Sequence, residues 1–395
     1  MPRITTNFFG DNIFTFSSNE CFCAKDIIHT SPNQPPTIKF KVSKNKNKPL
    51  LFAYKAKTGL VRIASNGTIE EDNILGTLLS LSTTSPKKMI SFFERNGFLF
   101  PLSSDYLSIE SELIDKIIEN IRNTVELITA ISEIKKDYTK IVLLTLRLMF
   151  NEGFKIELDT MEEPYYSCDH SFMNTLKMTS TSLTEVQEQE SFDNGCFSVY
   201  DTIYGSTYKF DRNEYNDIIS GSSISNNRII TPLYKQIVSL YCSYNGSTIE
   251  RKMIEFIFHL IHDENWILSY NSITGISEEE IIDLASLSSE MKTTTLEIAR
   301  HILGEEINAN LNGIYPQYDV QTMSPSWKVD SLLSALYFSL FYIKPDLELY
   351  RQCANPRCQK YFLVKTTSTH KKYCSIECCN RVTQDRYRKN RREKN

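Results

Sequence analysis

The stretch Cys353-Ala-Asn-Pro-Arg-Cys358, with Cys374-Ser-Ile-Glu-Cys378 after it, decides how the last 45 residues of the chain fold. The first two cysteines flank an Asn-Pro pair that favours a tight knuckle, and the second two form another closely spaced pair. Zinc prefers four soft ligands in tetrahedral geometry, usually delivered as two such pairs. The spacing therefore predicts a Zn²⁺ site with Cys353, Cys358, Cys374 and Cys378 as ligands.

The fourth ligand has alternatives in the sequence. Cys379 directly follows Cys378, but the three-residue gap from Cys374 to Cys378 closes the chelate more naturally, so we favour Cys378. His370 is a more remote substitute and is more simply read as a solvated turn residue. A chance cluster of reduced cysteines is disfavoured, because five of the ten cysteines fall in this short segment with paired spacing.

The residues between the two pairs predict a small finger. Tyr361 to Val364 has the composition of a strand, and a turn over Lys365 to Lys372 returns the chain toward Cys374. Ser375 is placed to cap a helix whose first turn contains Cys378. Knuckle, hairpin and helix describe a treble-clef-like finger with Phe362 as its core. A unit this small depends on the metal for most of its folding free energy.

This segment resembles the CGNR-type zinc fingers of bacteria, which often follow a stress-regulator-like domain and are presumed to bind DNA. The matching residues are Cys353-Ala-Asn-Pro-x-Cys358, Phe362, Tyr373-Cys374-Ser375 and Cys378-x-Asn380-Arg381 with the basic residues that follow. The resemblance implies a zinc-bound finger in a bacterial protein family. The family's glycine is replaced by Cys379 and the second pair is one residue tighter, which leaves the fourth ligand open.

A basic run without Pro or Gly follows the cysteines and is compatible with a helix. We expect its nucleic-acid-binding residues to be Arg381, Arg386, Arg388, Lys389, Arg391 and Arg392. From Arg351 onward there are 13 Lys and Arg against three acids, whereas the first 350 residues carry 31 basic and 45 acidic residues. Such asymmetry is typical of a tail that meets a polyanion, here DNA. A solubilising tail or a protein-docking surface is the alternative.

The rest of the chain predicts an α+β protein: a small N-terminal antiparallel sheet, a mainly helical body and the C-terminal finger with its basic helix. Alternating residues predict the sheet over roughly 1–65. Isoleucines from Ile114 to Ile128 recur at helical spacing, and Asp137 is placed to cap a second helix ending at Phe150. The stretch 178–191 is polar and linker-like. Strand-like residues on both sides of Gly205 predict a hairpin.

Two further helices are predicted in the second half of the chain. Ser277 to Glu280 has the pattern of a capping box before a helix that runs through Leu303. Another helix is expected from Val329 until Pro345 stops it. We divide the chain into an α+β segment 1–155, a linker and hairpin region 156–230, a helical segment 231–348 and the finger 349–395. No signal peptide or membrane span is recognised, so we expect a cytoplasmic protein with reduced cysteines.

The remaining chemistry-bearing residues give weaker signals. His259 and His262 lie three residues apart on a predicted helix, where ordinary packing is favoured over metal binding. Cys21 and Cys23 fit strand alternation better than a redox pair. Cys168 could be interpreted as a nucleophile activated by His170, but residues so close in sequence rarely form a working catalytic dyad.

No catalytic motif is found, so we do not expect an enzyme. The leading hypothesis is a zinc-finger transcription regulator that binds DNA, with an acidic body that senses a ligand or binds a protein partner. The alternatives are a zinc-stabilised protein-interaction module and an enzyme with an unrecognised site in the body.

Overall fold

The structure is a computed structural model. It describes residues 11–28, 37–55, 58–64, 67–70, 72–81, 86–101, 107–157, 164–178, 196–220, 224–225, 228–264, 266–271, 275–278, 287–320, 323–345, 347–365, 367–368 and 371–393. The linker-like stretch 178–191 therefore lies almost entirely outside the described residues, and His370 lies outside them too.

Contacts divide the chain into two compact units. Unit 1 comprises Met1–Glu133, Lys155–Ser167 and Ile307–Asn395, and unit 2 comprises Ile134–Phe154 and Cys168–Glu306. This division differs from the four consecutive segments expected from the sequence, because the stretch 307–348 belongs with the N-terminal sheet.

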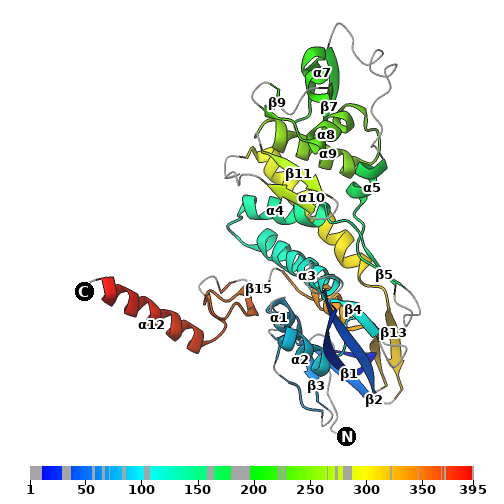
Figure 1. Cartoon of the computed structure of the whole chain (residues 1–395), viewed down its shortest axis with the longest axis vertical. Helices are drawn as coiled ribbons and strands as arrows, with labels where there is room; N and C mark the ends of the chain where they lie inside the picture. Colours follow the sequence, from blue (N-terminus) through cyan, green and yellow to red (C-terminus); the bar gives the residue numbers. More distant parts are fainter. Residues whose placement is uncertain are drawn as a thin grey trace. The chain divides into compact units, whose positions relative to one another are not determined.

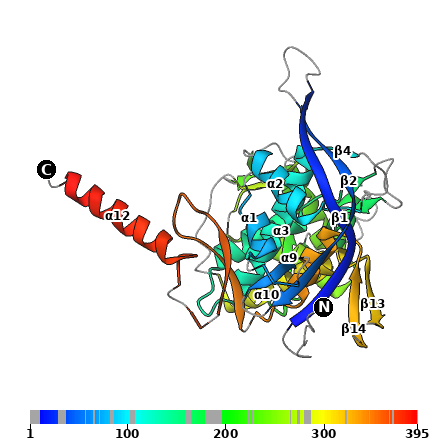
Figure 2. The same ribbon diagram turned by 90° about the horizontal axis from the view of Figure 1, so that it is seen from below.

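Unit 1 contains a six-stranded sheet, with helices packed against one side of it (Figures 1 and 2). Its strands are β1 (Asp11–Ile28), β2 (Thr37–Lys55), β3 (Gly59–Ile63), β4 (Leu107–Glu110), β13 (Ile314–Asp319) and β14 (Ser324–Val329). The order is β13-β14-β1-β2-β3, and β4 pairs with β2. The predicted N-terminal sheet is confirmed in β1 to β3. The prediction missed β13, β14 and the parallel pairing of β1 with β14, in which Phe14 is opposite Trp327.

Alternate side chains along β1 and β2 are buried, so one face of the sheet packs against the core. Cys21 and Cys23 are buried while Phe22 between them is 58% exposed, and Phe40 and Val42 are buried on β2. The Cys21 thiol donates to the Phe93 carbonyl oxygen at 3.1 Å. The strand interpretation of the two cysteines is thus confirmed.

Helices α1 (Ile74–Leu79), α2 (Pro86–Asn96), α3 (Ser111–Ser132) and α11 (Leu332–Phe341) also belong to unit 1. The predicted isoleucine stripe is buried along α3. The prediction that a helix starts at Val329 was wrong, because Val329 ends β14 and the cap is Ser331, whose hydroxyl accepts from Ser334 N at 3.0 Å. The helix ends at Phe341, ahead of Pro345.

Unit 1 is completed by short strand pairs and the C-terminal helix. These are β5 (Lys155–Ile156) with β6 (Tyr165–Tyr166), β15 (Glu348–Gln352) with β16 (Tyr361–Lys365), and α12 (Ile376–Glu393), which is red in Figures 1 and 2.

Unit 2 is mainly helical. Its helices are α4 (Tyr138–Met149), α5 (Ser171–Met178), α7 (Arg212–Ser220), α8 (Pro232–Ser243), α9 (Thr248–His262) and α10 (Ser289–Ala309), the last ending in unit 1. Its strand pairs are β7 (Cys196–Asp201) with β8 (Ser206–Asp211), β9 (Ile224–Ser225) with β10 (Arg228–Ile229), and β11 (Leu268–Asn271) with β12 (Gly275–Glu278).

Unit 2 confirms two of the local predictions and contradicts a third. Asp137 caps α4 as expected, accepting from Lys140 N at 3.0 Å. The hairpin around Gly205 is confirmed as β7 and β8, and the glycine's φ of 61° suits the turn. The capping box at Ser277 was wrong, because Ser277 lies in β12 opposite Ser269 and the described helix begins at Ser289. An apparent helix start can therefore occur within a strand.

Among the described residues, no helix combines the length and the apolar character needed to cross a membrane.

Candidate metal centre and basic helix

The knuckle between Cys353 and Cys358 is shaped by Asn355. The Asn355 side-chain oxygen accepts from Arg357 N at 3.0 Å, and its backbone carbonyl accepts from Cys358 N at 2.9 Å. These bonds turn the chain sharply, as the Asn-Pro pair predicts. Cys353 N also donates to Lys360 O at 2.9 Å. Both thiols are therefore presented on the same side of a tight turn at the end of β15.

The second cysteine pair lies at the start of α12. Ser375 Oγ accepts from Cys378 N at 3.3 Å, which confirms Ser375 as the cap and puts Cys378 in the first helical turn. Cys374 N points at Cys353 Sγ, 3.5 Å away. An N–H directed at a cysteine sulfur favours the thiolate form, which is the form that binds metal.

Four thiols converge between the knuckle and the helix. The sulfurs of Cys353, Cys358, Cys374 and Cys378 lie within 4.8 Å of one another. Cys374 Sγ is 3.6 Å from both Cys358 Sγ and Cys378 Sγ. Sulfurs that share a tetrahedral Zn²⁺, with bonds of about 2.3 Å, are separated by roughly 3.8 Å. The donor set and its spacing fit a zinc ion, so this part of the chain is a Zn²⁺ site.

Of the clustered thiols, Cys378 is the one whose pKa is shifted toward the thiolate form. Burial raises the pKa of Cys378, but hydrogen bonds from the Cys374 and Cys358 thiols outweigh it and lower this pKa to about 7. Burial raises the pKa of Cys374. Cys379 is described but is not part of the cluster. The clustering of the four sulfurs therefore favours Cys378 over Cys379 as the fourth zinc ligand, as the spacing of the cysteines predicted.

A small apolar core supports the metal site. Leu349, Cys353, Phe362 and Val364 are buried together, and the remaining clustered cysteines pack against them. Lys371 Nζ lies 5.4 Å from the centre of the Phe362 ring. Phe362 is therefore the core residue of the finger, as the sequence predicted.

The β15–β16 hairpin is joined to the rest of unit 1. Tyr350 OH lies 2.9 Å from Asn73 Nδ2, and the Tyr350 carbonyl accepts from Thr129 Oγ1 at 3.0 Å. Tyr361 OH donates to Glu126 at 2.5 Å. A Cβ on Gly76 would lie 2.6 Å from Tyr361 O, so the absent side chain allows α1 to approach the backbone of β16. The hairpin is thus anchored on α1 and α3.

Helix α12 carries the predicted basic residues. Arg381, Arg386 and Arg388 are exposed, and Lys389, Arg391 and Arg392 follow on the same helix. Tyr387 is 69% exposed. Asp385 lies 3.4 Å from Arg357 of the knuckle, so one of the few acids on the helix is paired with the finger. The exposed cations are therefore available to an external partner.

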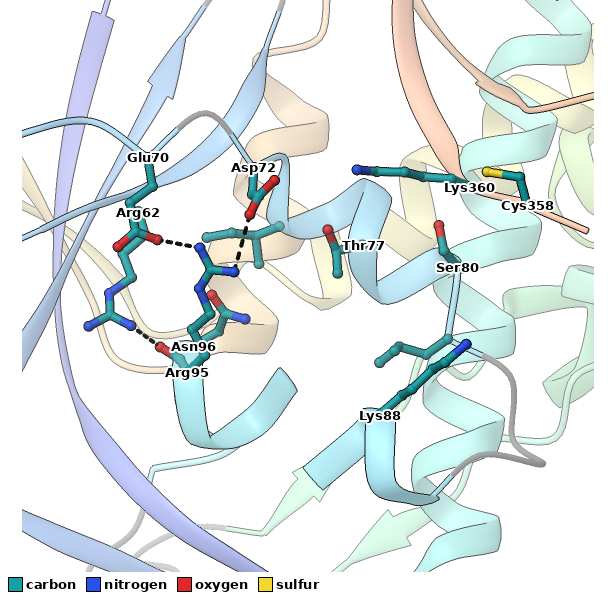
Figure 3. A pocket seen from close by; sticks show the side chains of 12 residues that line it. Arg62, Glu70, Asp72, Thr77, Ser80, Lys88, Arg95, Asn96, Cys358 and Lys360 are labelled. Atoms are coloured by element: carbon teal, nitrogen blue, oxygen red, sulfur yellow. Dashed lines mark hydrogen bonds and ion pairs between the residues drawn. The ribbon is translucent and has the colours of Figure 1, made fainter. Parts of the chain in front are cut away.

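A pocket of about 350 Å³ lies beside the knuckle (Figure 3). Arg95 is paired there with Glu70 at 2.7 Å and Asp72 at 3.1 Å. Lys88 from α2 and Lys360 from the finger also line it. The pocket extends the basic character of the finger onto the neighbouring part of unit 1.

The structure changes the interpretation of Cys168 and His170. Cys168 Sγ lies 3.6 Å from His170 Nδ1, so the two side chains are in contact. Burial raises the pKa of the Cys168 thiol, which disfavours a reactive thiolate. Sequence reasoning missed that Glu305 and Glu306, from α10, also meet this imidazole. A separation of 135 residues leaves no local signal for that meeting.

His259 and His262 lie in hydrogen-bonded networks. His259 is 2.7 Å from Asp201 through Nε2 and 2.6 Å from Asp263 through Nδ1. His262 is 2.8 Å from Tyr208 OH and 2.7 Å from Tyr234 OH. All four ring nitrogens have protein partners, which supports the packing interpretation.

The His259 network predicts a loss of stability in alkali. Burial lowers the pKa of His259, but hydrogen bonds to Asp201 and Asp263 outweigh it and raise the pKa from 6.5 to about 9. Because the folded-state pKa of His259 is raised, its contribution to stability is complete below the unfolded-state pKa of 6.5. This contribution is lost as pH rises through 9. Between about pH 7 and pH 9 the free energy of unfolding should fall by about 2 kcal/mol.

Urea unfolding followed across this range measures the effect. His259→Gln should flatten the dependence, since the titrating group is gone. An unchanged slope in that variant would assign the titration to another group.

Comparison with known proteins identifies the C-terminal segment. The family model of the CGNR zinc finger matches residues 350–391, which include all four clustered cysteines. The match covers about a tenth of the chain and so describes the finger alone. No curated protein and no solved structure matches the chain.

Proposed function

Because residues 350–391 form a CGNR zinc finger, we propose that the chain is a DNA-binding regulator whose finger presents α12 to the phosphate backbone. The observation that carries the proposal is a polar helix with exposed arginines directly attached to a metal-held knuckle. Such a helix has little to bury against its own protein. Lys and Arg that neutralise phosphates release counterions, and this drives binding to nucleic acid.

The positions of the arginines along α12 support a continuous contact. At 3.6 residues per turn, Arg381, Arg388 and Arg392 fall within about 40° of one another around the helix axis. Arg357, at the tip of the knuckle, extends this side through its pairing with Asp385. One side of the helix can therefore follow a line of phosphates.

The charge of the remaining chain also supports the proposal. The first 350 residues have a net charge of −14 (31 basic, 45 acidic), whereas the last 45 have +10 (13 basic, three acidic). A duplex should be repelled by the former and attracted by the latter. The acidic part would then sense a ligand or bind a partner, as in a transcription regulator.

The test compares duplex binding by the whole protein and two matched triple variants, using fluorescence anisotropy. One variant replaces Arg381, Arg388 and Arg392 with Gln. The control replaces Lys116, Lys135 and Lys209, which are exposed in the rest of the chain, and removes the same charge. With five phosphate contacts, log affinity should fall against log salt with a slope of about −4 to −5.

The α12 variant should bind weakly, with a slope nearer −2 if three contacts are lost. The lysine control should bind as the unmodified protein does. Absence of binding at low salt, or equal binding by both variants, would reject DNA binding and favour a protein partner for the finger.

A further inference from the structure

A second group of metal-ligand side chains lies in unit 2, apart from the finger. Cys168, His170 and Glu306 are all buried, and one potential ligand atom from each lies within 4.8 Å of the others. Cys168 and His170 come from the segment before α5, and Glu306 comes from α10. Thiol, imidazole and carboxylate thus meet in a buried position.

Glu305 fixes the orientation of the imidazole. Its Oε2 lies 2.9 Å from His170 Nδ1, and its Oε1 accepts from Ser171 N at 3.3 Å. The same carboxylate therefore holds the ring and the start of α5. A histidine that binds metal through one nitrogen usually donates its other N–H to a carboxylate in this way.

The other ring nitrogen is aimed at Glu306. His170 Nε2 lies 3.5 Å from Glu306 Oε2, yet it has no hydrogen-bond partner among the described residues, although the side chain is fully buried. Of the buried histidines in the described part of the chain, His259 and His262 have partners at both nitrogens. A buried nitrogen without a hydrogen bond is uncommon and needs an explanation.

A metal ion would account for this arrangement. Nitrogen and oxygen ligands of one tetrahedral Zn²⁺ lie roughly 3.3 Å apart, close to the observed 3.5 Å between Nε2 and Oε2. Mg²⁺ and Ca²⁺ prefer oxygen ligands, whereas a set of sulfur, nitrogen and oxygen suits Zn²⁺.

We propose that Cys168, His170 and Glu306 form a second Zn²⁺ site, with Glu305 positioning the imidazole. Three protein ligands leave the fourth position of a tetrahedral ion to water or to an external donor. The site differs in this respect from the finger, where four cysteines complete the coordination. It gives the acidic part of the chain a metal centre of its own.

Zinc analysis of the full chain tests the proposal with matched variants. The unmodified protein should hold about two Zn²⁺, and Cys168→Ser or Glu306→Gln should hold about one. Cys374→Ser, which disrupts the finger, should also hold about one. Cys242→Ser, a half-buried cysteine of unit 2 outside both clusters, serves as the control and should keep about two.

A single zinc in the unmodified protein, or two in the folded Cys168→Ser variant, would overturn the proposal. Circular dichroism shows whether each variant is folded. Should the unit 2 variants fail to fold, Co²⁺ titration still decides when it uses a chain in which Cys353, Cys358, Cys374, Cys378 and Cys379 of the finger are all replaced by serine. A thiolate-to-cobalt absorption band is expected from Cys168, and a chain that binds no Co²⁺ would overturn the second site. Failure here leaves the proposed DNA binding untouched, because Cys168, His170 and Glu306 lie in unit 2 and the proposed DNA contacts lie on α12.

Discussion

Replacing Cys374 with serine should release the zinc of the finger and unfold the segment from the knuckle to the start of α12. Cys374 Sγ contacts two of the other three sulfurs at 3.6 Å, so its loss removes a central ligand. The apolar core of the finger is small. Zinc binding contributes on the order of 10 kcal/mol to the folding of isolated fingers. We expect the same scale here.

The expected unfolding is local. The β15–β16 hairpin is held on α1 and α3 through Tyr350 and Tyr361, independently of the metal. Hydrogen exchange followed by mass spectrometry should therefore show lost protection at the knuckle and the first turns of α12, with β15 still protected. Loss of protection throughout unit 1 would mean that the contacts of the β15–β16 hairpin with α1 and α3 are not maintained without zinc.

Adjacent cysteines provide the control for the ligand assignment. Cys379→Ser should keep the zinc, because Cys379 lies outside the sulfur cluster, while Cys378→Ser should lose it. The reverse result would make Cys379 the fourth ligand.

Replacing Arg251 with methionine should destabilise unit 2 by about 3–5 kcal/mol, the usual effect of leaving one charge of a buried ion pair unpaired. Arg251 Nε lies 2.7 Å from Glu255 Oε1, and the Glu255 side chain is fully buried. Arg251 also donates to Tyr241 O at 2.7 Å. The second Glu255 oxygen accepts from Thr202 N at 3.0 Å. The pair therefore joins α8 and α9 to the β7–β8 turn.

The neighbouring residue supplies a matched control. Lys252 Nζ lies 2.6 Å from Glu297, but both side chains are partly exposed, so Lys252→Met should cost about 0–1 kcal/mol. Urea unfolding followed by circular dichroism measures both variants. Adding Glu255→Leu to Arg251→Met should recover part of the loss, because it removes the unpaired charge. Equal effects of the Arg251 and Lys252 variants would contradict the buried-pair interpretation.

The sequence predicted the features that depend on local spacing. The cysteine pairs, the Ser375 cap, the strand beginning at Tyr361 and the α3 stripe each involve residues close in the chain, where periodicity and capping rules apply. The four clustered cysteines could therefore be predicted from the sequence, with Cys379 left open as an alternative to Cys378.

Features that depend on distant partners could not be predicted. β13 and β14 are short strands containing Pro316 and Pro325, and proline within such a run argues against a strand. They form because β1 offers an edge for pairing. The imidazole of His170 gains its partners from α10, and nothing in the motif Cys168-Asp-His170 indicates Glu305 or Glu306.

The parallel pairing of β1 with β14 has a consequence for synthesis on the ribosome. Phe14 is opposite Trp327, so one edge of β1 stays unpaired until more than 300 further residues have been translated. The stretch Cys168–Glu306, most of unit 2, emerges entirely within that interval and can fold first. An open strand edge invites pairing with other chains. Translation that stops before Ser324 thus yields a nascent chain with an unprotected strand, exposed to aggregation and to capture by chaperones.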